Sequence, residues 1–420
     1  MMRTFNVFCS CCISLIFSVC FNSYVFAQQK SLPYFLERAK TNSPLLNDYQ
    51  NQLMLLSLDS LKIRAGLLPQ VNGSSNLLYA PALKGIGYDP AITNGQLVSG
   101  IVTVSKEITT KARLNALLKG LQLSKDSLGN QRAFSILDLE KSIAAQYITT
   151  WGNQQLLQLA KETLLLLEKQ DGLLKKLTQS SVFKQTEYLT FKVNLEQQQL
   201  VVLQNQNQYK NDFVALNYLS GIADTTTYDL ATVPVQQMDI PTFENSLLYK
   251  KYSIDSLRTL NTLNQLELSY KPKLNVFADA GYQSSLPKQA YKNFGWSVGL
   301  NLNIPIYDGG LKKLSINQIN LQQLTQYRYR DFYKIQYRQQ NLQLKQMIKQ
   351  YEELINKSNK QLNYAQTLVD ANALQLKTGD VRMTDYILSI NNYLNLKINI
   401  VQNKINQLHM INQLHYFTIK

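Results

Sequence analysis

Few residues of this chain are of the types found in catalytic sites, and none of them forms a recognisable catalytic set. Asp308 precedes Gly309 and Gly310, where a carboxylate could act as an acid or lie beside a phosphate. An aspartate at the start of a helix more commonly accepts hydrogen bonds from backbone N–H groups, so we interpret Asp308 as a helix cap. The sequence shows no paired carboxylates, nucleophile motif or glycine-rich phosphate loop in a suitable context, which argues against an enzyme.

The histidines and the remaining paired acids do not predict a metal site or a cofactor site. His409 and His415 are the only histidines, and their spacing of six residues on one predicted helix does not place both on the same side. Asp380 and Asp385 lie five residues apart beside Gly379, where they could attract cations. Solvated turn residues are the simpler interpretation of these two carboxylates.

The N-terminal segment 1–27 has the pattern of a signal peptide. Arg3 supplies the positive start, an apolar run extends from Phe5 to about Phe21, and Val25-Phe26-Ala27 fits a cleavage site. The mature chain would then begin at Gln28 without a thiol, because all four cysteines lie upstream: Cys9, Cys11, Cys12 and Cys20. A lipid anchor on Cys20 is the alternative, although Val19 is not the small residue usually found before a lipidated cysteine.

The charge is strongly basic, at +15 for the whole chain. Without Arg3, 42 basic residues stand against 28 acidic ones, a charge of +14. Lys and Arg are scattered singly through Gln- and Asn-rich stretches, without a basic block or a nucleic-acid module. We therefore expect solvated helix faces and no nucleic-acid partner.

The predicted helices and strands occur twice along the chain, with a period near 200 residues. The segment from Leu61 to Tyr79 is matched by that from Leu266 to Tyr282, and 186–189 (TEYL) by 384–387 (TDYI). Each half is predicted as helix, strand, loop, strand, long helix, turn, long helix. The predicted boundaries are a first repeat at 28–221 with a strand pair at about 69–105 and a helical hairpin at about 110–220, a linker or equatorial segment at 222–242, and a second repeat at 243–420 with a strand pair at about 272–306 and a hairpin at about 310–420.

The second hairpin predicts an unusually long helix. No Pro or Gly occurs from Leu311 to Lys377, and at 1.5 Å per residue such a helix would be roughly 100 Å long. A compact domain does not need this length. A coiled coil or the wall of a tube of helix pairs would use it.

The strands have the length and alternation of membrane-spanning strands. From Ser297 to Ile306 apolar and polar residues alternate, and Pro272 to Gln283 repeats the pattern with Phe277 as the exception. The weaker strands are predicted near Val71 to Tyr79 and Leu97 to Ser105. Each has about ten residues, the length a tilted transmembrane strand requires, and no apolar run after Ala27 is long enough for a spanning helix. The expected lipid-facing residues are Leu274, Val276, Val298, Leu300, Leu302 and Ile304.

Four strands cannot close a barrel alone, and unpaired strand edges are not tolerated in hydrocarbon. Two copies would give eight strands, whose interior is filled by side chains. Three copies would give twelve strands around a lumen. We therefore expect an α+β membrane protein in which four strands per chain contribute to a shared 12-stranded trimeric barrel.

In the order and spacing of its motifs, the chain resembles the TolC-like outer-membrane efflux channel family over Ser31 to about Phe417. The motifs that carry the resemblance are 42–45 (NSPL), 65–71 (AGLLPQV), 215–221 (ALNYLSG) and 304–310 (IPIYDGG). The resemblance implies a homotrimer in outer-membrane lipid with a helical tunnel through the periplasm, a periplasmic adaptor and an inner-membrane transporter as partners, and a passive exit duct for efflux or for a type I secretion-like system.

The same resemblance implies that the helical tips contact the adaptor or form a gate. The residues concerned are Gln179, Ser180, Ser181, Val182, Lys377, Thr378, Gly379, Asp380 and Asp385. The first tip departs from the family pattern, because 179–182 (QSSV) has no glycine where 377–380 (KTGD) does. An exported periplasmic coiled-coil or adaptor protein is the alternative, but it leaves the four alternating segments without a purpose.

Overall fold

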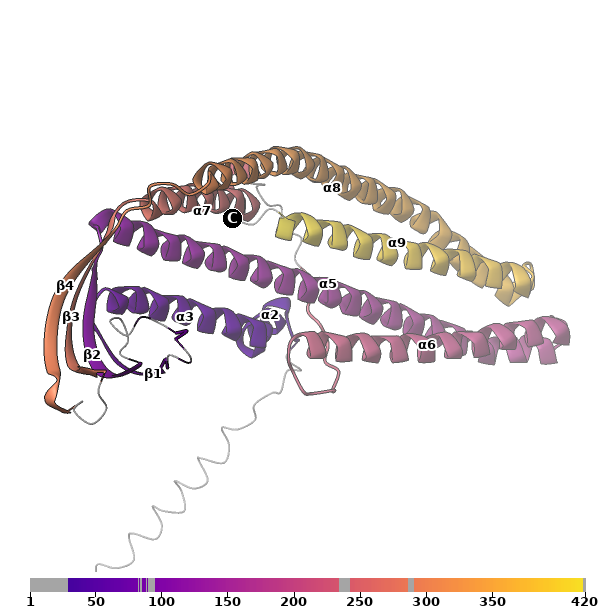
Figure 1. Cartoon of the computed structure of the whole chain (residues 1–420). Coiled ribbons are helices and arrows are strands. Elements are labelled where there is room, and N and C mark those ends of the chain that lie inside the picture. Colours follow the sequence, from indigo (N-terminus) through magenta and orange to yellow (C-terminus); the bar gives the residue numbers. More distant parts are fainter. Residues whose placement is uncertain are drawn as a thin grey trace, which may run out of the picture. The chain divides into compact units, whose positions relative to one another are not determined.

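The computed structural model describes residues 29–81, 83, 85–87, 89, 95–233, 242–285 and 291–417. The expected signal peptide and its four cysteines lie outside these residues, and so do part of the 222–242 linker and part of both inter-strand loops. Over the described residues the chain is rich in helix and contains one small antiparallel sheet (Figure 1). The elements are α2 (Leu32–Asn42), α3 (Pro44–Gly66), β1 (Gln70–Tyr79), β2 (Gln96–Ile108), α5 (Lys111–Gln179), α6 (Gln185–Leu219), the 3-10 turn η1 (Phe243–Asn245), α7 (Leu247–Ser269), β3 (Lys273–Ser284), β4 (Phe294–Asn303), α8 (Leu311–Thr378) and α9 (Met383–Phe417).

Contacts divide the chain into two compact units, and each unit draws on both halves of the sequence. Among the described residues, one unit comprises 29–43, 138–233 and 342–417, and the other comprises those within 44–137 and 242–341. We call them the hairpin unit and the sheet unit. They are described separately below.

The sheet unit contains all four strands, in the order β1-β2-β3-β4, with every neighbouring pair antiparallel. Figure 1 shows these strands side by side, with α3 leading into β1, β2 into α5, α7 into β3 and β4 into α8. The pairing of β2 with β3 joins two hairpins that are far apart in the sequence, from Val98↔Ser284 to Ile108↔Leu274. The four predicted strands are therefore confirmed, and β2 is longer at both ends than the predicted Leu97 to Ser105.

The predicted end of β4 is wrong. β4 ends at Asn303, so Ile304 lies outside the strand in which it was expected. Asn303 pairs with Lys273, the first residue of β3, and Pro272 precedes it. Residues beyond Asn303 therefore have no partner strand, and Pro305 lacks an N–H group with which to extend the ladder.

The hairpin unit has an aromatic core between α2, α5 and α6. Phe35, Tyr147 and Phe213 are fully or almost fully buried, and the ring centroids of Phe35 and Phe213 are 6.1 Å apart. The Tyr147 hydroxyl lies 2.7 Å from the carbonyl oxygen of Ala231 and 3.1 Å from that of Lys30. Lys30 also forms a parallel bridge with Leu230, so one buried tyrosine holds the start of the described chain to the linker.

Both helical hairpins turn through the same capping motif, 198 residues apart. At the end of α8, the Gly379 N–H donates to Leu376 O and the Asp380 N–H donates to Gln375 O, with Gly379 at φ +79°. At the end of α5, the Ser181 N–H donates to Thr178 O and the Val182 N–H donates to Leu177 O, with Ser181 at φ +61°. This is the Schellman pattern, and in the first tip a serine takes the left-handed position usually held by glycine. The tip that lacks a glycine therefore turns where the sequence predicted.

Removing the ring of Phe213 should destabilise the hairpin unit strongly. Phe213 is 0% exposed, and truncation of a buried phenylalanine costs about 3–5 kcal/mol. We expect Phe213→Ala to lower the thermal midpoint measured by circular dichroism in detergent. Tyr218→Ala on the same helix is the control, because Tyr218 is 81% exposed and its loss should change stability by less than about 0.5 kcal/mol. Equal effects would contradict the described core.

The two tips should respond in opposite directions to glycine substitutions. Ser181→Gly removes a strained left-handed serine and should stabilise by about 0.5–1 kcal/mol, whereas Gly379→Ala should destabilise by about 1–2 kcal/mol. A Cβ on Gly379 would also lie 3.1 Å from Val182 Cγ1. Thermal midpoints of both variants test this. Ser180→Gly, next to the strained position, should not stabilise, and the idea fails if it matches Ser181→Gly.

Candidate functional site

The register of the sheet places the alternating apolar residues of all four strands on one face. Directly paired residues of antiparallel strands project to the same side, as Leu274 does with Leu302, and Val276 with Leu300. We define the apolar face by the following members: Val71, Leu77, Val98, Val102, Val104, Ile108, Leu274, Val276, Ala278, Ala280, Val298, Leu300 and Leu302. Much of it is exposed, with Val298 at 67% and Leu300 at 70%. A face of this kind on a monomer requires a cover.

The opposite side, which we call the polar face, carries amide, hydroxyl and charged groups. It includes Asn72, Ser99, Asn275, Asp279 and Asn301, with Ser297 Oγ donating to Asp279 Oδ1 at 2.8 Å. Phe277, the exception in the predicted alternation, lies on this face directly opposite Gly299. A Cβ on Gly299 would lie 2.4 Å from the Phe277 ring, so the aromatic ring occupies the space that the glycine leaves.

Five of the six residues expected to face lipid lie on the apolar face. These are Leu274 and Val276 on β3, and Val298, Leu300 and Leu302 on β4. The exception is Ile304, which follows β4. The strands contain 10, 13, 12 and 10 residues, enough for each to cross a hydrocarbon layer when tilted.

Both ends of the apolar face have aromatic residues nearby, and a lysine joins them at the helix end. Aromatic side chains gather at the loop end, where the Tyr282 and Phe294 rings lie 5.3 Å apart and Trp296 is 77% exposed. At the helix end, Tyr307 is exposed and Lys312 lies over the Tyr270 ring at 5.3 Å. Aromatic residues at both ends of an apolar band are typical of surfaces placed between two membrane–water interfaces.

The nine residues expected at the helical tips are all exposed in the hairpin unit. The structure brings the two tips together through Val182 and Gly379, above a shared cluster that includes Phe183, Leu376 and Met383. Asp380 accepts a hydrogen bond from Thr378 at 2.5 Å, and Asp385 lies in the first turn of α9, where its charge suits the helix dipole. The two carboxylates therefore have local structural partners.

A polar contact near the first tip was not predicted from the sequence. The Tyr188 hydroxyl donates to Asp171 Oδ1 at 3.1 Å, and Lys192 Nζ lies 3.4 Å from Asp171 Oδ2. Partial desolvation, followed by this hydrogen bond, raises the pKa of Tyr188. The only sequence signal was Tyr188 within the recurring 186–189 motif, because Asp171 comes from the other helix of the hairpin.

Asp308 caps α8, as its position predicted. Its carboxylate accepts from the Lys312 N–H at 2.7 Å and the Gly310 N–H at 2.9 Å. These bonds, led by that of Lys312 and joined by one from Tyr270, lower the pKa of Asp308. The ionised carboxylate of Asp308 therefore has a structural role as the cap of α8, which leaves little reason to assign it a role as a proton donor.

The described residues offer no metal cluster. His409 Nε2 lies 3.3 Å from Thr149 Oγ1, and burial lowers its pKa, while His415 packs edge-on against Tyr416. No group of three or more His, Cys, Asp or Glu side chains suited to a metal ion occurs within the described part of the chain.

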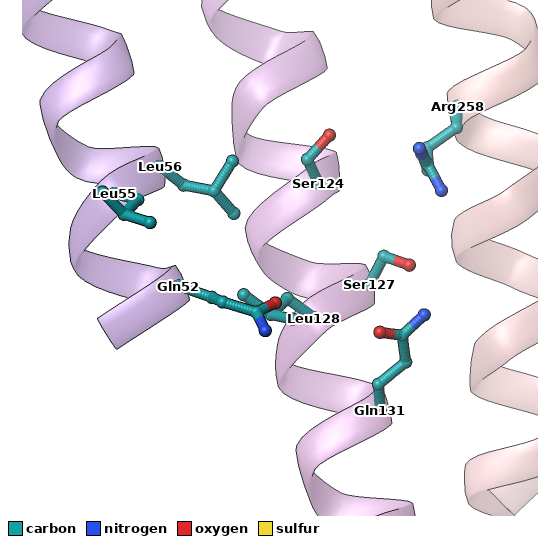
Figure 2. Close-up of a pocket in the computed structure, with 8 residues that line it drawn as sticks. All are labelled: Gln52, Leu55, Leu56, Ser124, Ser127, Leu128, Gln131 and Arg258. Carbon is teal, nitrogen blue, oxygen red and sulfur yellow. The ribbon is translucent and has the colours of Figure 1, made fainter. Parts of the chain in front are cut away.

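An open pocket of about 350 Å³ lies in the sheet unit between α3, α5 and α7 (Figure 2). Leu55 and Leu56 from α3 face Ser124 and Leu128 of α5, and Arg258 approaches from α7. Arg258 is the only charged residue in its lining. The other polar residues of the lining are uncharged amides and hydroxyls: Gln52, Ser124, Ser127 and Gln131.

None of the helices in the described ranges combines the length and apolar character needed to cross a membrane.

Comparison with known proteins identifies the fold. The chain aligns with CusC, whose structures were reported in connection with transmembrane channel formation, at a TM-score of 0.78 and 13% identity, covering 94% of this chain and 93% of CusC. It aligns with the outer membrane protein VceC of Vibrio cholerae at a TM-score of 0.76 and 12% identity over 92% and 96% of the two chains. For the MtrE outer membrane channel of Neisseria gonorrhoeae, the TM-score is 0.74 and the identity 13%, over 92% and 88%.

No family model and no curated protein sequence matches the chain. At 12–13% identity, the likeness to these solved structures concerns the fold. The TolC-like fold that the sequence motifs predicted is confirmed: the chain folds as these outer-membrane channel proteins do, over nearly its whole length.

Proposed function

We propose that this chain is one subunit of a channel in the outer membrane, and that three copies form one passive duct extending into the periplasm. The observation that carries the proposal is the apolar face, which is continuous over four strands of membrane-spanning length and exposed in the single chain. Lipid is the cover that suits such a face on an exported protein. The fold shared with outer-membrane channel structures supports this assignment.

The free strand edges favour several copies. β1 and β4 are the two edges of the described sheet, and each carries ten residues without a partner strand on its outer side. In hydrocarbon every backbone N–H and C=O group needs a partner, so the edges must pair with other chains. Three copies give the smallest closed sheet with an open lumen, lined by the polar face.

The helices next to the two edges support the same assembly. α3, which leads into β1, exposes Met54, Leu58 and Leu61 on one side, and α8, which follows β4, exposes Leu314, Leu321 and Ile335. Leu321 is 65% exposed and Met54 is 61% exposed. Because α3 and α8 adjoin opposite edges of the sheet, pairing β4 of one copy with β1 of the next would bring these two stripes together.

The duct requires no catalysis by this chain. We propose that a periplasmic adaptor and an inner-membrane transporter act at the helical tips. The nine exposed tip residues named above are available there for contact or gating. Their exposure in the hairpin unit supports this role. The resemblance to the TolC-like family supplies the class of partner, and the energy for transport would come from the transporter.

The size of the complex tests the proposal directly. We expect material extracted in detergent from outer membranes of cells expressing the gene to form a heat-sensitive particle of three chains. Its mass by light scattering, corrected for detergent, gives the number of copies. A monomer, or a protein that folds without detergent in the periplasmic fraction, would exclude the shared barrel and favour the periplasmic coiled-coil protein.

A charge placed on each face of β4 tests which face meets lipid. Val298→Lys on the apolar face should cost about 2–4 kcal/mol if Val298 lies near the bilayer midplane, and should reduce the folded complex in the outer membrane. Asn301→Lys on the polar face should be tolerated, because a water-filled lumen accommodates an ammonium group. The amount of heat-sensitive complex on gels measures both. The reverse pattern would show that the polar face is turned outward.

A further inference from the structure

Among the described residues of the four strands, Lys106 is the only charged residue on the side of the sheet that bears the apolar face. Register places it opposite Val276, in the row that also contains Leu300, while its neighbour Glu107 projects to the polar face. The side chain of Lys106 is exposed, between Val104 and Ile108 on the same strand. An ammonium group among residues meant for lipid is costly unless it finds water or an anion.

Strand pairing cannot bury Lys106 in an assembly. β2 is an interior strand, paired with β1 on one side and β3 on the other, so the edges available to another copy lie elsewhere. Lys106 is in the second row from the helix end of β2, where a lysine stem can lie along the apolar surface while its ammonium reaches the interface. The described residues provide no ion pair for it.

The surroundings of this end of the sheet are also basic. Segments 64–69, 106–113, 267–273 and 303–313, which join the strands to the helices, contain eight Lys or Arg residues against three Asp or Glu residues. Two of the three carboxylates are occupied, since Glu107 pairs with Arg113 and Asp308 caps α8. The loop end of the apolar face is marked instead by Tyr282, Phe294 and Trp296.

We propose that Lys106 binds the phosphate of an anionic phospholipid headgroup in the leaflet nearest the helices. This inference rests on the proposed function, since it requires the apolar face to be in a membrane. The acyl chains of the lipid would cover Val104, Val276 and Leu300, and the phosphate would accept hydrogen bonds from the ammonium group. The surrounding basic segments add attraction for a negatively charged surface.

Lipid binding to the purified complex tests the proposal. We would titrate the detergent-extracted complex with phosphatidylglycerol and, separately, with phosphatidylcholine, and count bound lipids by native mass spectrometry. Lys106→Gln should weaken phosphatidylglycerol binding about five-fold, as expected for the loss of one interfacial basic residue, with little change for phosphatidylcholine. Lys106→Arg should retain the affinity.

Lys273→Gln is the matched control. Lys273 lies at the same end of the sheet but pairs with Asn303 on the polar face, so its loss should weaken phosphatidylglycerol binding far less than the loss of Lys106 does. Equal losses in both variants, or no loss in Lys106→Gln, would overturn the site while leaving the channel intact. Failure of the wild-type chain to yield a three-chain complex from the outer membrane would overturn the proposed function and this inference together.

Discussion

The pairing of β2 with β3 is the constraint on which the rest of the structure depends. These strands lie about 170 residues apart in the sequence, and their eleven aligned positions place Val102 beside Ala280 and Val104 beside Ala278. Because side chains alternate along a strand, a slip of one residue would turn the apolar residues of one hairpin to the polar side of the other. This one register therefore combines two amphipathic hairpins into a single sheet with an apolar face and a polar face.

The order of the helices in the sheet unit follows from the order of the strands. Each strand is joined to a helix at one end, so the order of the strands also sets the order α3, α5, α7 and α8 around the sheet unit. Short polar contacts fix the junctions: Asp308 caps α8, and Glu107 pairs with Arg113 where β2 enters α5. In the hairpin unit, matching Schellman turns end α5 and α8, so local backbone hydrogen bonds fix where each tip turns.

The two ends of the sheet differ in charge. Aromatic rings mark the loop end of the apolar face, and basic residues surround the helix end, with Lys106 on the face itself. In a membrane these groups would meet different environments, since aromatic rings suit the interfacial region and ammonium groups suit phosphate. The alternation of apolar and polar residues therefore distinguishes the two faces of the sheet. The placement of aromatic and basic residues distinguishes its two ends.

The number of strands, the two long hairpins and the cap at Asp308 could all be predicted from the sequence, because alternation and capping are local properties of neighbouring residues. For the same reason, five of the six residues expected to face lipid lie on the apolar face. The sequence did not predict the end of β4 before Ile304, since a strand ends where its partner begins, and that partner is 30 residues away. Only the tertiary structure explained Phe277, which packs over Gly299 of the next strand, and the contact between Tyr188 and Asp171. The strand register, the side of the sheet on which each side chain lies and the contacts between distant segments all depend on which backbone groups pair. Local patterns in the sequence do not determine that pairing.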